Sequence, residues 1–333
     1  MIGTSTVHKV FLGTVQIWAN EVVNVLGNRA NVLLRSLFTA EQWGDQNLKK
    51  RVVVPVGGEI GATVRDFAIA IAEIGTAQAD SWGSDLTLEV RGTVSGMGGA
   101  PNSGTGGNVI WGNLLGRLGQ KLKVILTGLL RSGGGGGGRA GNGGAGQYPY
   151  TLTESRSYQN NYNGFFDGSW SSSRESWSSP WSVRWDGATV ATSGNSNIGS
   201  SPPSVAVGAY TYIRGGHANG SGVSKQYHVS RTSTQQQATQ GGIAPDPGRG
   251  QGYDGDATLG GAAVGGDTNA GVSGKSGDGG GWGLPGQAGA NGTNGNVSAG
   301  LAGATAGLAG FYLRDIANME FTNDNGTALG RVA

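Results

Sequence analysis

The chain has 333 residues, 67 of them glycine, and a formal net charge of +2. Glycine buries no side chain and loses the most backbone entropy on folding, so a chain this rich in it must stay disordered or use bare backbone structurally. Its 9 Trp, 9 Tyr and 7 Phe, with only 13% charged residues, argue against disorder. The near-neutral charge argues against a nucleic-acid binder, and the lack of cysteine excludes disulfides and thiolate metal sites.

Residues 1–38 are predicted to form short attachment strands. Apolar stretches at 7–13 and 14–18 meet at a turn at Gly13-Thr14, and residues 31–38 are another strand candidate. A helix over 16–26 is the competing interpretation, because Ile17 and Val22 roughly follow helical spacing. We expect no signal peptide, since residues 1–30 contain no basic segment followed by an apolar core. We expect no membrane span, since the longest apolar stretch, 122–130, is short and interrupted.

Residues 39–131 are predicted to be a β-domain that opens with one helical turn at 39–43. Strands are expected within 51–56, 66–74, 85–94 and 120–130. Two of them alternate strictly, with Leu86, Leu88 and Val90 in one, and Leu122, Val124 and Leu126 in the other. A period of two is typical of a strand with one buried face.

Residues 132–146 and 241–310 form a split glycine-rich region. A three-residue period matches the polyproline II helix, and glycine allows such helices to approach and pair their backbone groups. A polyglycine-II-like bundle is the favoured interpretation; a flexible linker and a collagen-like triple helix are the alternatives. A break in the period at Ser298 predicts a turn between two helices. The periodic glycines are Gly274, Gly277, Gly280, Gly283, Gly286, Gly289, Gly292 and Gly295.

Residues 147–240 carry most of the aromatic side chains and are predicted to be an inserted β-sandwich. A hairpin with its turn at Asp186-Gly187 is expected there. Exposed aromatic residues bind sugars or protein partners, although a small domain poor in Leu and Ile also needs them for its core. The candidate receptor-binding residues of the chain are Trp170, Trp177, Tyr210, Tyr212, Tyr253 and Trp282.

Residues 311–333 are predicted to be a C-terminal β-hairpin around Asn325-Gly326. The fold class expected for the whole chain is therefore all-β. It combines an N-terminal β-rich region, a split polyglycine-II-like bundle and an inserted aromatic-rich β-sandwich.

No catalytic spacing is evident, and we predict no enzyme activity, cofactor or metal site. The three histidines are isolated. Asp254 and Asp256 do not complete a calcium loop and are interpreted as solvated carboxylates. Glu154, Asp167 and Glu175 leave a glycosidase pair open as a minor alternative.

Several stretches, taken in order, resemble glycine-rich phage tail proteins. The run 86–107 ends a strand in a glycine-rich turn, 121–146 carries a strand into polyglycine, and 310–333 closes the chain. The segments 7–18, 30–43 and 51–62 complete the pattern. They are similar to tail-fibre adhesins of T-even-like phages and to distal parts of siphophage tail-tip proteins. The resemblance covers 7–146 and 241–333 and leaves out the aromatic segment.

The resemblance implies a virion structural protein of the tail tip or tail fibre, made in the host cytoplasm, that contributes to binding a bacterial surface receptor, either protein or polysaccharide. Loops around 245–256 and 267–275 would touch the receptor, and the N-terminal region would contact other tail or baseplate proteins. A homotrimer and a single-chain cap both remain open. The alternatives are a baseplate connector or head-decoration protein, and a surface-polysaccharide depolymerase.

Overall fold

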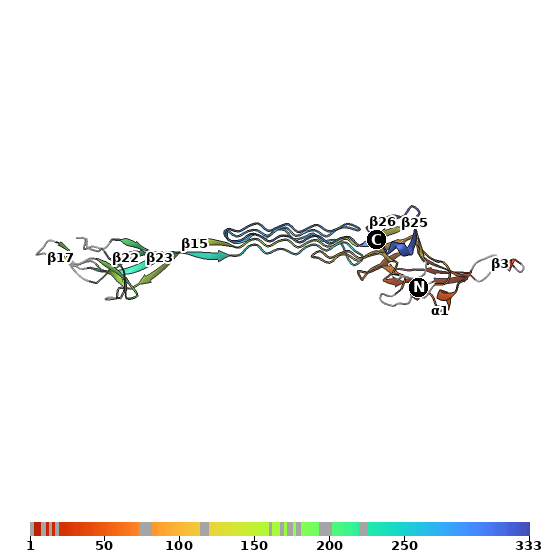
Figure 1. The fold of residues 1–333 in the computed structure, drawn as a ribbon, viewed down its shortest axis with the longest axis horizontal. Coiled ribbons are helices and arrows are strands. Elements are labelled where there is room, and N and C mark those ends of the chain that lie inside the picture. Colours follow the sequence, from red (N-terminus) through yellow and green to blue (C-terminus); the bar gives the residue numbers. More distant parts are fainter. Residues whose placement is uncertain are drawn as a thin grey trace. The chain divides into compact units, whose positions relative to one another are not determined.

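The computed structural model describes residues 3–7, 11–12, 15–16, 20–72, 82–113, 120–159, 162–166, 170–171, 176–177, 181–192, 202–219 and 225–333. These residues divide into two compact units. Unit 1 combines Met1–Gly146 with Thr239–Ala333, and unit 2 is Gln147–Ala238. Strands make up almost all of their regular secondary structure, so the all-β prediction is confirmed (Figure 1).

Unit 1 contains a parallel β-helix with three faces, in which each turn of the chain contributes one strand to each face. The first face stacks β4 (Asn20–Val25), β7 (Leu48–Val54), β10 (Leu86–Val90), β13 (Leu122–Leu126) and β25 (Met319–Asn323). The second stacks β5 (Arg29–Ala30), β8 (Glu59–Gly61), β11 (Thr93–Ser95), β14 (Leu129–Arg131) and β26 (Thr327–Leu329). The third stacks β6 (Val32–Leu33), β9 (Ile69–Ala70), β12 (Ile110–Trp111), β24 (Phe311–Arg314) and β27 (Arg331–Val332).

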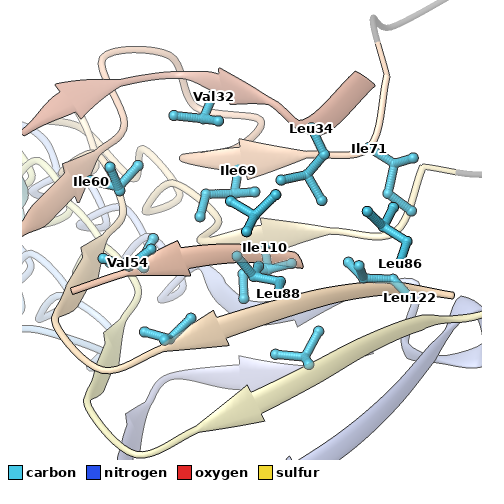
Figure 2. Close-up of a cluster of buried hydrophobic side chains, with 14 of the residues drawn as sticks. Val32, Leu34, Val54, Ile60, Ile69, Ile71, Leu86, Leu88, Ile110 and Leu122 are labelled. Atoms are coloured by element: carbon cyan, nitrogen blue, oxygen red, sulfur yellow. The ribbon is translucent and has the colours of Figure 1, made fainter. Parts of the chain in front are cut away.

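The interior of the β-helix is filled by aliphatic side chains from all three faces. Leu86, Leu88 and Val90 are fully buried on β10, and the inward residues of β13 are buried in the same way. Figure 2 shows Ile69 and Ile110 of the third face gathered against Leu88. The predicted period of two is therefore confirmed, and its buried side faces the axis of the β-helix.

One of the N-terminal strands joins the first face, and two others pair with each other. β1 (Gly3–Val7) pairs antiparallel with β4, and β2 (Phe11–Leu12) pairs with β3 (Val15–Gln16). The alternative helix over 16–26 is wrong, because Asn20–Val25 is a strand of the β-helix. The strand expected over 31–38 is limited to β6, and a 3-10 helix, η1 (Leu34–Leu37), follows it. The turn predicted at Gly13-Thr14 lies outside the described residues.

The helical turn predicted after residue 38 is confirmed as α1 (Ala40–Gly44). Thr39 accepts a hydrogen bond from the backbone N–H of Gln42, and the Gln42 side chain accepts one from the backbone of Thr39. This capping box satisfies two of the donors that a helix start leaves unpaired. With five residues, α1 is the longest helix of the described segments, and none of them could span a membrane.

The C-terminal residues do not form the predicted hairpin. β25 pairs in parallel with β13, and β26 pairs in parallel with β14, so the two strands lie on different faces. Asn325 has a φ of 62°, which makes the segment 324–326 a corner of the β-helix and not a hairpin turn. The residues that seemed to pair with one another instead complete the last turn of the β-helix.

Between β14 and β24 the chain leaves the β-helix and forms the glycine bundle. It consists of six extended segments, named here G1 (133–145), G2 (240–251), G3 (256–266), G4 (270–281), G5 (284–295) and G6 (298–310). Figure 1 shows them as long, nearly parallel traces running away from β25 and β26.

Backbone hydrogen bonds at every third residue hold the glycine bundle together. Gly274, Gly277 and Gly280 of G4 donate to Gly141, Gly138 and Gly135 of G1, over 2.8–2.9 Å. G1 also bonds to G2, G5 and G6, so it lies at the centre, and residues 133–138 are buried. The polyglycine-II-like bundle is confirmed. Neither the flexible linker nor the triple helix describes it, because ordered bonds join segments of one chain.

The eight periodic glycines span two segments and not one. The chain reverses between G4 and G5, where Leu284 donates to Gly281 over 3.1 Å and Gly283 has a φ of 69°. Glycine tolerates this left-handed conformation, so the three-residue frame continues unbroken through a turn. The turn predicted at Ser298 is confirmed, because Gly295 donates to Ser298 over 3.0 Å where G5 gives way to G6.

Unit 2 is built on one antiparallel sheet. Its strand order is β20-β19-β16-β23-β22-β21, with β15 also paired to β23. The edge strands β20 and β21 contact each other, so the sheet curls toward a barrel in place of the two stacked sheets of a sandwich. The strands are β15 (Gly146–Arg156), β16 (Gly164–Phe166), β19 (Ser182–Trp185), β20 (Ala188–Thr192), β21 (Ser204–Val207), β22 (Tyr210–Asn219) and β23 (Gln226–Thr239).

The predicted hairpin in unit 2 is confirmed. β19 and β20 pair antiparallel across Asp186 and Gly187, whose φ values are 47° and 83°. Two consecutive positive φ angles define the primed turn that matches the twist of a two-residue hairpin.

Candidate functional site

Two of the six candidate residues lie in unit 1, where the glycine bundle meets the β-helix. Tyr253 donates its backbone N–H to Gly96 over 2.9 Å, and its ring covers Gly61 so closely that a Cβ there would overlap it. Tyr253 therefore contacts the β-helix through both its backbone and its ring.

Trp282 lies at the same end and takes part in a joint with the β-helix. The guanidinium carbon of Arg131 is 4.0 Å from the centre of the Trp282 ring. Arg131 also donates to Glu59 and to the hydroxyl of Ser95, each over 2.9 Å. A cation held over an indole ring and tied to a carboxylate positions the turn between G4 and G5.

The other end of the bundle gathers residues that are distant in sequence. We call it the bundle tip and define it as Gly146, Thr239 and the turns 267–270 and 295–298. Thr239 donates its hydroxyl to Thr268 over 2.8 Å, and Asn296 donates its backbone N–H to Asn269 over 3.0 Å. Gly280 pairs near the β-helix end of G1, and Gly271 pairs with Gly144 near the tip. At about 3.1 Å a residue, these nine steps separate the two ends by about 28 Å.

The two loops that the resemblance implicates therefore lie at opposite ends of the bundle. Residues 267–275 include one turn of the bundle tip, whereas 245–256 run to the β-helix, where Asp254 accepts the backbone N–H of Gly98 over 2.7 Å. The sequence could not separate them, because the direction of each glycine segment depends on its bonding partners.

In unit 2, Tyr212 belongs to the core. It is 4% exposed, and the centre of its ring lies 5.8 Å from the centre of the Trp185 ring, which is also 4% exposed. With Phe165, Val183 and Val229 they form the buried cluster that the curled sheet encloses. Tyr212 is thus not available as a surface contact, in line with the interpretation that aromatic residues replace aliphatic ones in this core.

Tyr210 is half-buried beside a stacked arginine. The guanidinium carbon of Arg231 lies 4.3 Å from the Tyr210 ring and 4.4 Å from the Trp185 ring. Arg231 also donates to Glu154 over 2.7 Å, and this hydrogen bond raises the pKa of Arg231. Glu154 is committed to that ion pair, and its suggested glycosidase partners, Asp167 and Glu175, lie outside the described residues.

Trp170 and Trp177 are brought together. They lie on β17 (Trp170–Ser171) and β18 (Ser176–Trp177), and the antiparallel register pairs Trp170 directly with Trp177.

A surface hollow in unit 2 was missed by the sequence analysis. Its volume is ≈ 390 Å³, and it lies where β15, β22 and β23 meet. The two consecutive glycines inside β22, Gly215 and Gly216, were the available signal, because glycine within a strand often marks a bulge. The lining residues are Ser155, Arg156, Ser157, Gly215, His228, Val229 and Ser230.

Asp254 and Asp256, where the chain passes from G2 to G3, are engaged by the protein itself. Asp254 pairs with Arg249 over 2.6 Å, and Asp256 accepts from the side chain of Gln251 over 3.0 Å. Across the parts of the chain that the structure describes, no three His, Asp or Glu side chains are grouped so that they could hold a metal ion.

Comparison with known proteins finds no similar curated protein and no similar solved structure. It does find a family, described as Phage tail fibre adhesin Gp38, that matches residues 20–209. The match begins at the first residue of β4 and covers the strands of the β-helix up to β14, and G1. It continues into unit 2, which the sequence resemblance had left out. It spans more than half of the chain and confirms the tail-fibre resemblance, and the chain therefore belongs to the Gp38 family of phage tail fibre adhesins.

Proposed function

We propose that this tail fibre adhesin binds its bacterial surface receptor through unit 2, with the bundle tip contributing to the contact. The observation that carries the proposal is where unit 2 enters the chain. The chain leaves G1 at Gly146 and returns to G2 at Thr239, and both residues belong to the end of the bundle that is remote from the β-helix. A receptor-binding module is best carried where the anchoring part of the protein does not cover it.

The aromatic content of unit 2 supports this role. Trp170 and Trp177 are paired across a two-stranded ribbon that is separate from the main sheet. Tryptophan and tyrosine dominate the energetics of binding surfaces because they bury a large area at a small entropic cost. We propose Trp170, Trp177 and Tyr210 as contacts, and we propose that Tyr253 and Trp282 act in holding the bundle on the β-helix.

We further propose that the β-helix attaches the protein to the rest of the tail fibre. Among the described strands, β1 covers the first face beyond β4, whereas β5 and β6 end the other two faces without a further strand. Uncovered strand edges are templates for pairing with another chain. Residues 1–38 cannot be removed as a block, because Val22 and Leu34 fill the core of the β-helix; removing residues 1–16 is the appropriate test of attachment.

The receptor proposal is tested by replacing residues 147–238 with Gly-Asn-Gly. Gly143 donates to Gly242 over 2.9 Å, so G1 and G2 already run side by side and a short turn can join them. We expect the shortened protein to fold and to enter particles, and we expect it neither to bind host cells nor to compete with phage adsorption. Binding or competition equal to that of the full chain would contradict the proposal.

Point variants test which aromatic residues contact the receptor. Trp170→Ala with Trp177→Ala should weaken cell binding at least about tenfold, since truncating a central aromatic anchor costs about 2 kcal/mol or more. Tyr253→Ala removes an aromatic ring at the β-helix end and serves as the matched control, for which unchanged cell binding is expected.

The family is one of adhesins and not of enzymes. The protein is accordingly a component of the virion tail. Synthesis in the host cytoplasm and the number of copies in each fibre stay predictions.

A further inference from the structure

The hollow of unit 2 combines one cation with several hydrogen-bond donors. Ser155, Arg156 and Ser157 line it from the end of β15, and His228 and Ser230 line it from β23. No carboxylate is among its lining residues, all of which the structure describes. A volume of ≈ 390 Å³ is within the range of about 300–1,000 Å³ typical of small-ligand sites.

A β-bulge opens the hollow. Arg214 of β22 pairs with Val229, and His217 pairs with Tyr227, so Gly215 and Gly216 together face the single residue His228. A Cβ on Gly215 would lie 3.0 Å from the Cβ of His228, whereas a Cβ on Gly216 would meet nothing within 4 Å. Gly215 therefore approaches His228 closely at the edge of the hollow, and a side chain at this position would press on His228. Bulges often accompany functional sites because they redirect the strand locally.

The donors of the hollow are held in place. The backbone N–H of Tyr158 donates to Nδ1 of His228 over 2.9 Å. Because Nδ1 is the acceptor, the neutral imidazole carries its hydrogen on Nε2 and presents a donor there. The three serine hydroxyls add donors that rotate to suit a ligand.

Arg156 is anchored on one side. Its guanidinium carbon lies 4.7 Å from the Trp185 ring, its Nε donates to Asp186 over 3.3 Å, and its Nη1 donates to the carbonyl of Ser155 over 3.3 Å. The Nη2 amino group takes part in neither bond and can donate to a ligand. Asp186 forms an ion pair with Arg156 over 3.3 Å but does not line the hollow, so the guanidinium is the one charged group among the lining residues.

The charge of unit 2 favours the same kind of ligand. Residues 147–238 contain six Arg and Lys against four Asp and Glu, which leaves +2, the formal charge of the whole chain. Guanidinium groups pair with carboxylates and phosphates through parallel hydrogen bonds, and hydroxyl and imidazole donors suit the oxygens of a sugar.

We propose that this hollow binds an anionic saccharide of the bacterial surface, a sugar that carries a carboxylate or a phosphate. The guanidinium of Arg156 neutralises the acidic group, and His228 Nε2–H with the hydroxyls of Ser155, Ser157 and Ser230 donates to the sugar oxygens. The inference rests on the proposal that unit 2 meets the bacterial surface, and it names the class of ligand.

The test is a titration of the full chain with galacturonate, glucose 6-phosphate and galactose, followed by saturation-transfer NMR. We expect at least one of the two acidic sugars to bind and galactose to bind at least tenfold more weakly. Binding of galacturonate alone would identify a carboxylate as the group that pairs with Arg156. Binding of glucose 6-phosphate alone would identify a phosphate as that group. Equal binding of galactose, or binding of none of the three, would overturn the proposal.

Two matched pairs of variants locate the binding. Arg156→Gln should weaken binding of the acidic sugar at least tenfold, whereas Arg184→Gln, which removes the same charge from a residue that does not line the hollow, should leave it unchanged. Gly215→Val should press on His228, displace this lining residue and abolish binding, whereas Gly216→Val should not. Binding that survives both Arg156→Gln and Gly215→Val would place the sugar elsewhere and refute the assignment.

Cell binding separates this inference from the function on which it rests. If the full chain binds host cells and Arg156→Gln and Gly215→Val bind them equally well, the saccharide inference is wrong and the receptor proposal stands. If the acidic sugars bind the hollow but the full chain does not bind host cells, the receptor proposal is wrong.

Discussion

The β-helix and the glycine bundle belong to one compact unit, yet side chains stabilise the first and the backbone stabilises the second. In the β-helix, the side chains face inward and the core is aliphatic: Leu88 is 0% exposed. In the bundle, the backbone itself forms the core, and the large apolar side chains point outward: Leu259 is 81% exposed. In the β-helix, the hydrophobic effect drives the burial of side chains. In the bundle, the buried backbone groups must form hydrogen bonds with one another.

This difference determines which substitutions each region can tolerate. A core of side chains has a volume that other side chains can approximately fill. A core of backbone leaves no space at all where segments touch: a Cβ on Gly137 would overlap the carbonyl oxygen of Gly277. The bundle therefore requires glycine where its segments touch and tolerates other residues at positions that face outward. The β-helix requires large side chains at its inward positions.

The largest expected effect comes from adding one methyl group inside the bundle. Gly137→Ala should destabilise the protein by more than about 4 kcal/mol, because two backbone segments must separate and their hydrogen bonds break. Thermal unfolding measures the loss. Gly265→Ala is the control, since a Cβ there meets nothing within 4 Å. Equal stability of the two variants would show that the bundle is not held by backbone contact.

A truncation in the β-helix should have the next largest effect. Leu88→Ala leaves a cavity in a fully buried position and should cost about 2–5 kcal/mol in the free energy of unfolding. Leu259→Ala makes the same chemical change on the outside of the bundle and should stay within about 0.5 kcal/mol of the parent. Denaturant titration of both variants compares them, and similar losses would remove the distinction between the two regions.

A smaller effect is expected at the joint between the regions. Arg131→Gln removes the cation over Trp282 and the ion pair to Glu59, and should cost about 1–2 kcal/mol. Hydrogen exchange should then quicken at Gly283, whose N–H donates to Ser132 over 2.9 Å, while the amides of β10 keep their protection. Uniformly faster exchange would mean that Arg131 stabilises the whole unit and not the joint.

The smallest effect concerns the charge on Asp278 in G4. Its carboxylate accepts the backbone N–H of Gly260 over 2.8 Å and lies 3.3 Å from Lys275, and these contacts lower the pKa of Asp278, the first more than the second. A lowered folded-state pKa stabilises the protein above the unfolded-state pKa of about 4, and the benefit is lost as the pH falls below it.

Asp278→Asn should therefore lower Tm by less than about 2 °C at pH 7, a small amount because the ion pair is open to solvent. The difference from the parent should shrink as the pH falls below about 4. A difference that does not shrink at all between pH 7 and pH 3 would assign the effect to packing and not to the charge.

Local features of this fold could be predicted, because neighbouring residues determine them. The alternation of Leu86, Leu88 and Val90 predicted a buried face, and Asp186-Gly187 predicted a hairpin. The three-residue glycine period predicted backbone pairing between extended segments, which the bonds of Gly277 confirm.

Features that depend on distant partners could not be predicted. Leu122 pairs with Met319, and no local pattern connects two residues so far apart. For the same reason, the last strands were interpreted as a hairpin. Among the candidate contacts, Tyr212 and Tyr253 were chosen for their residue type, and burial inside a curled sheet or against Gly61 depends on packing that spacing alone does not encode.

The placement of the glycine bundle and unit 2 within a single turn of the β-helix has a consequence for folding. Arg131 ends β14, and the third strand of that turn begins only at Phe311. During synthesis the first three turns can stack while the fourth lacks its last strand, which emerges only after the bundle and unit 2. Such high contact order slows folding, so assembly of the bundle and closure of the β-helix become one late, coupled step.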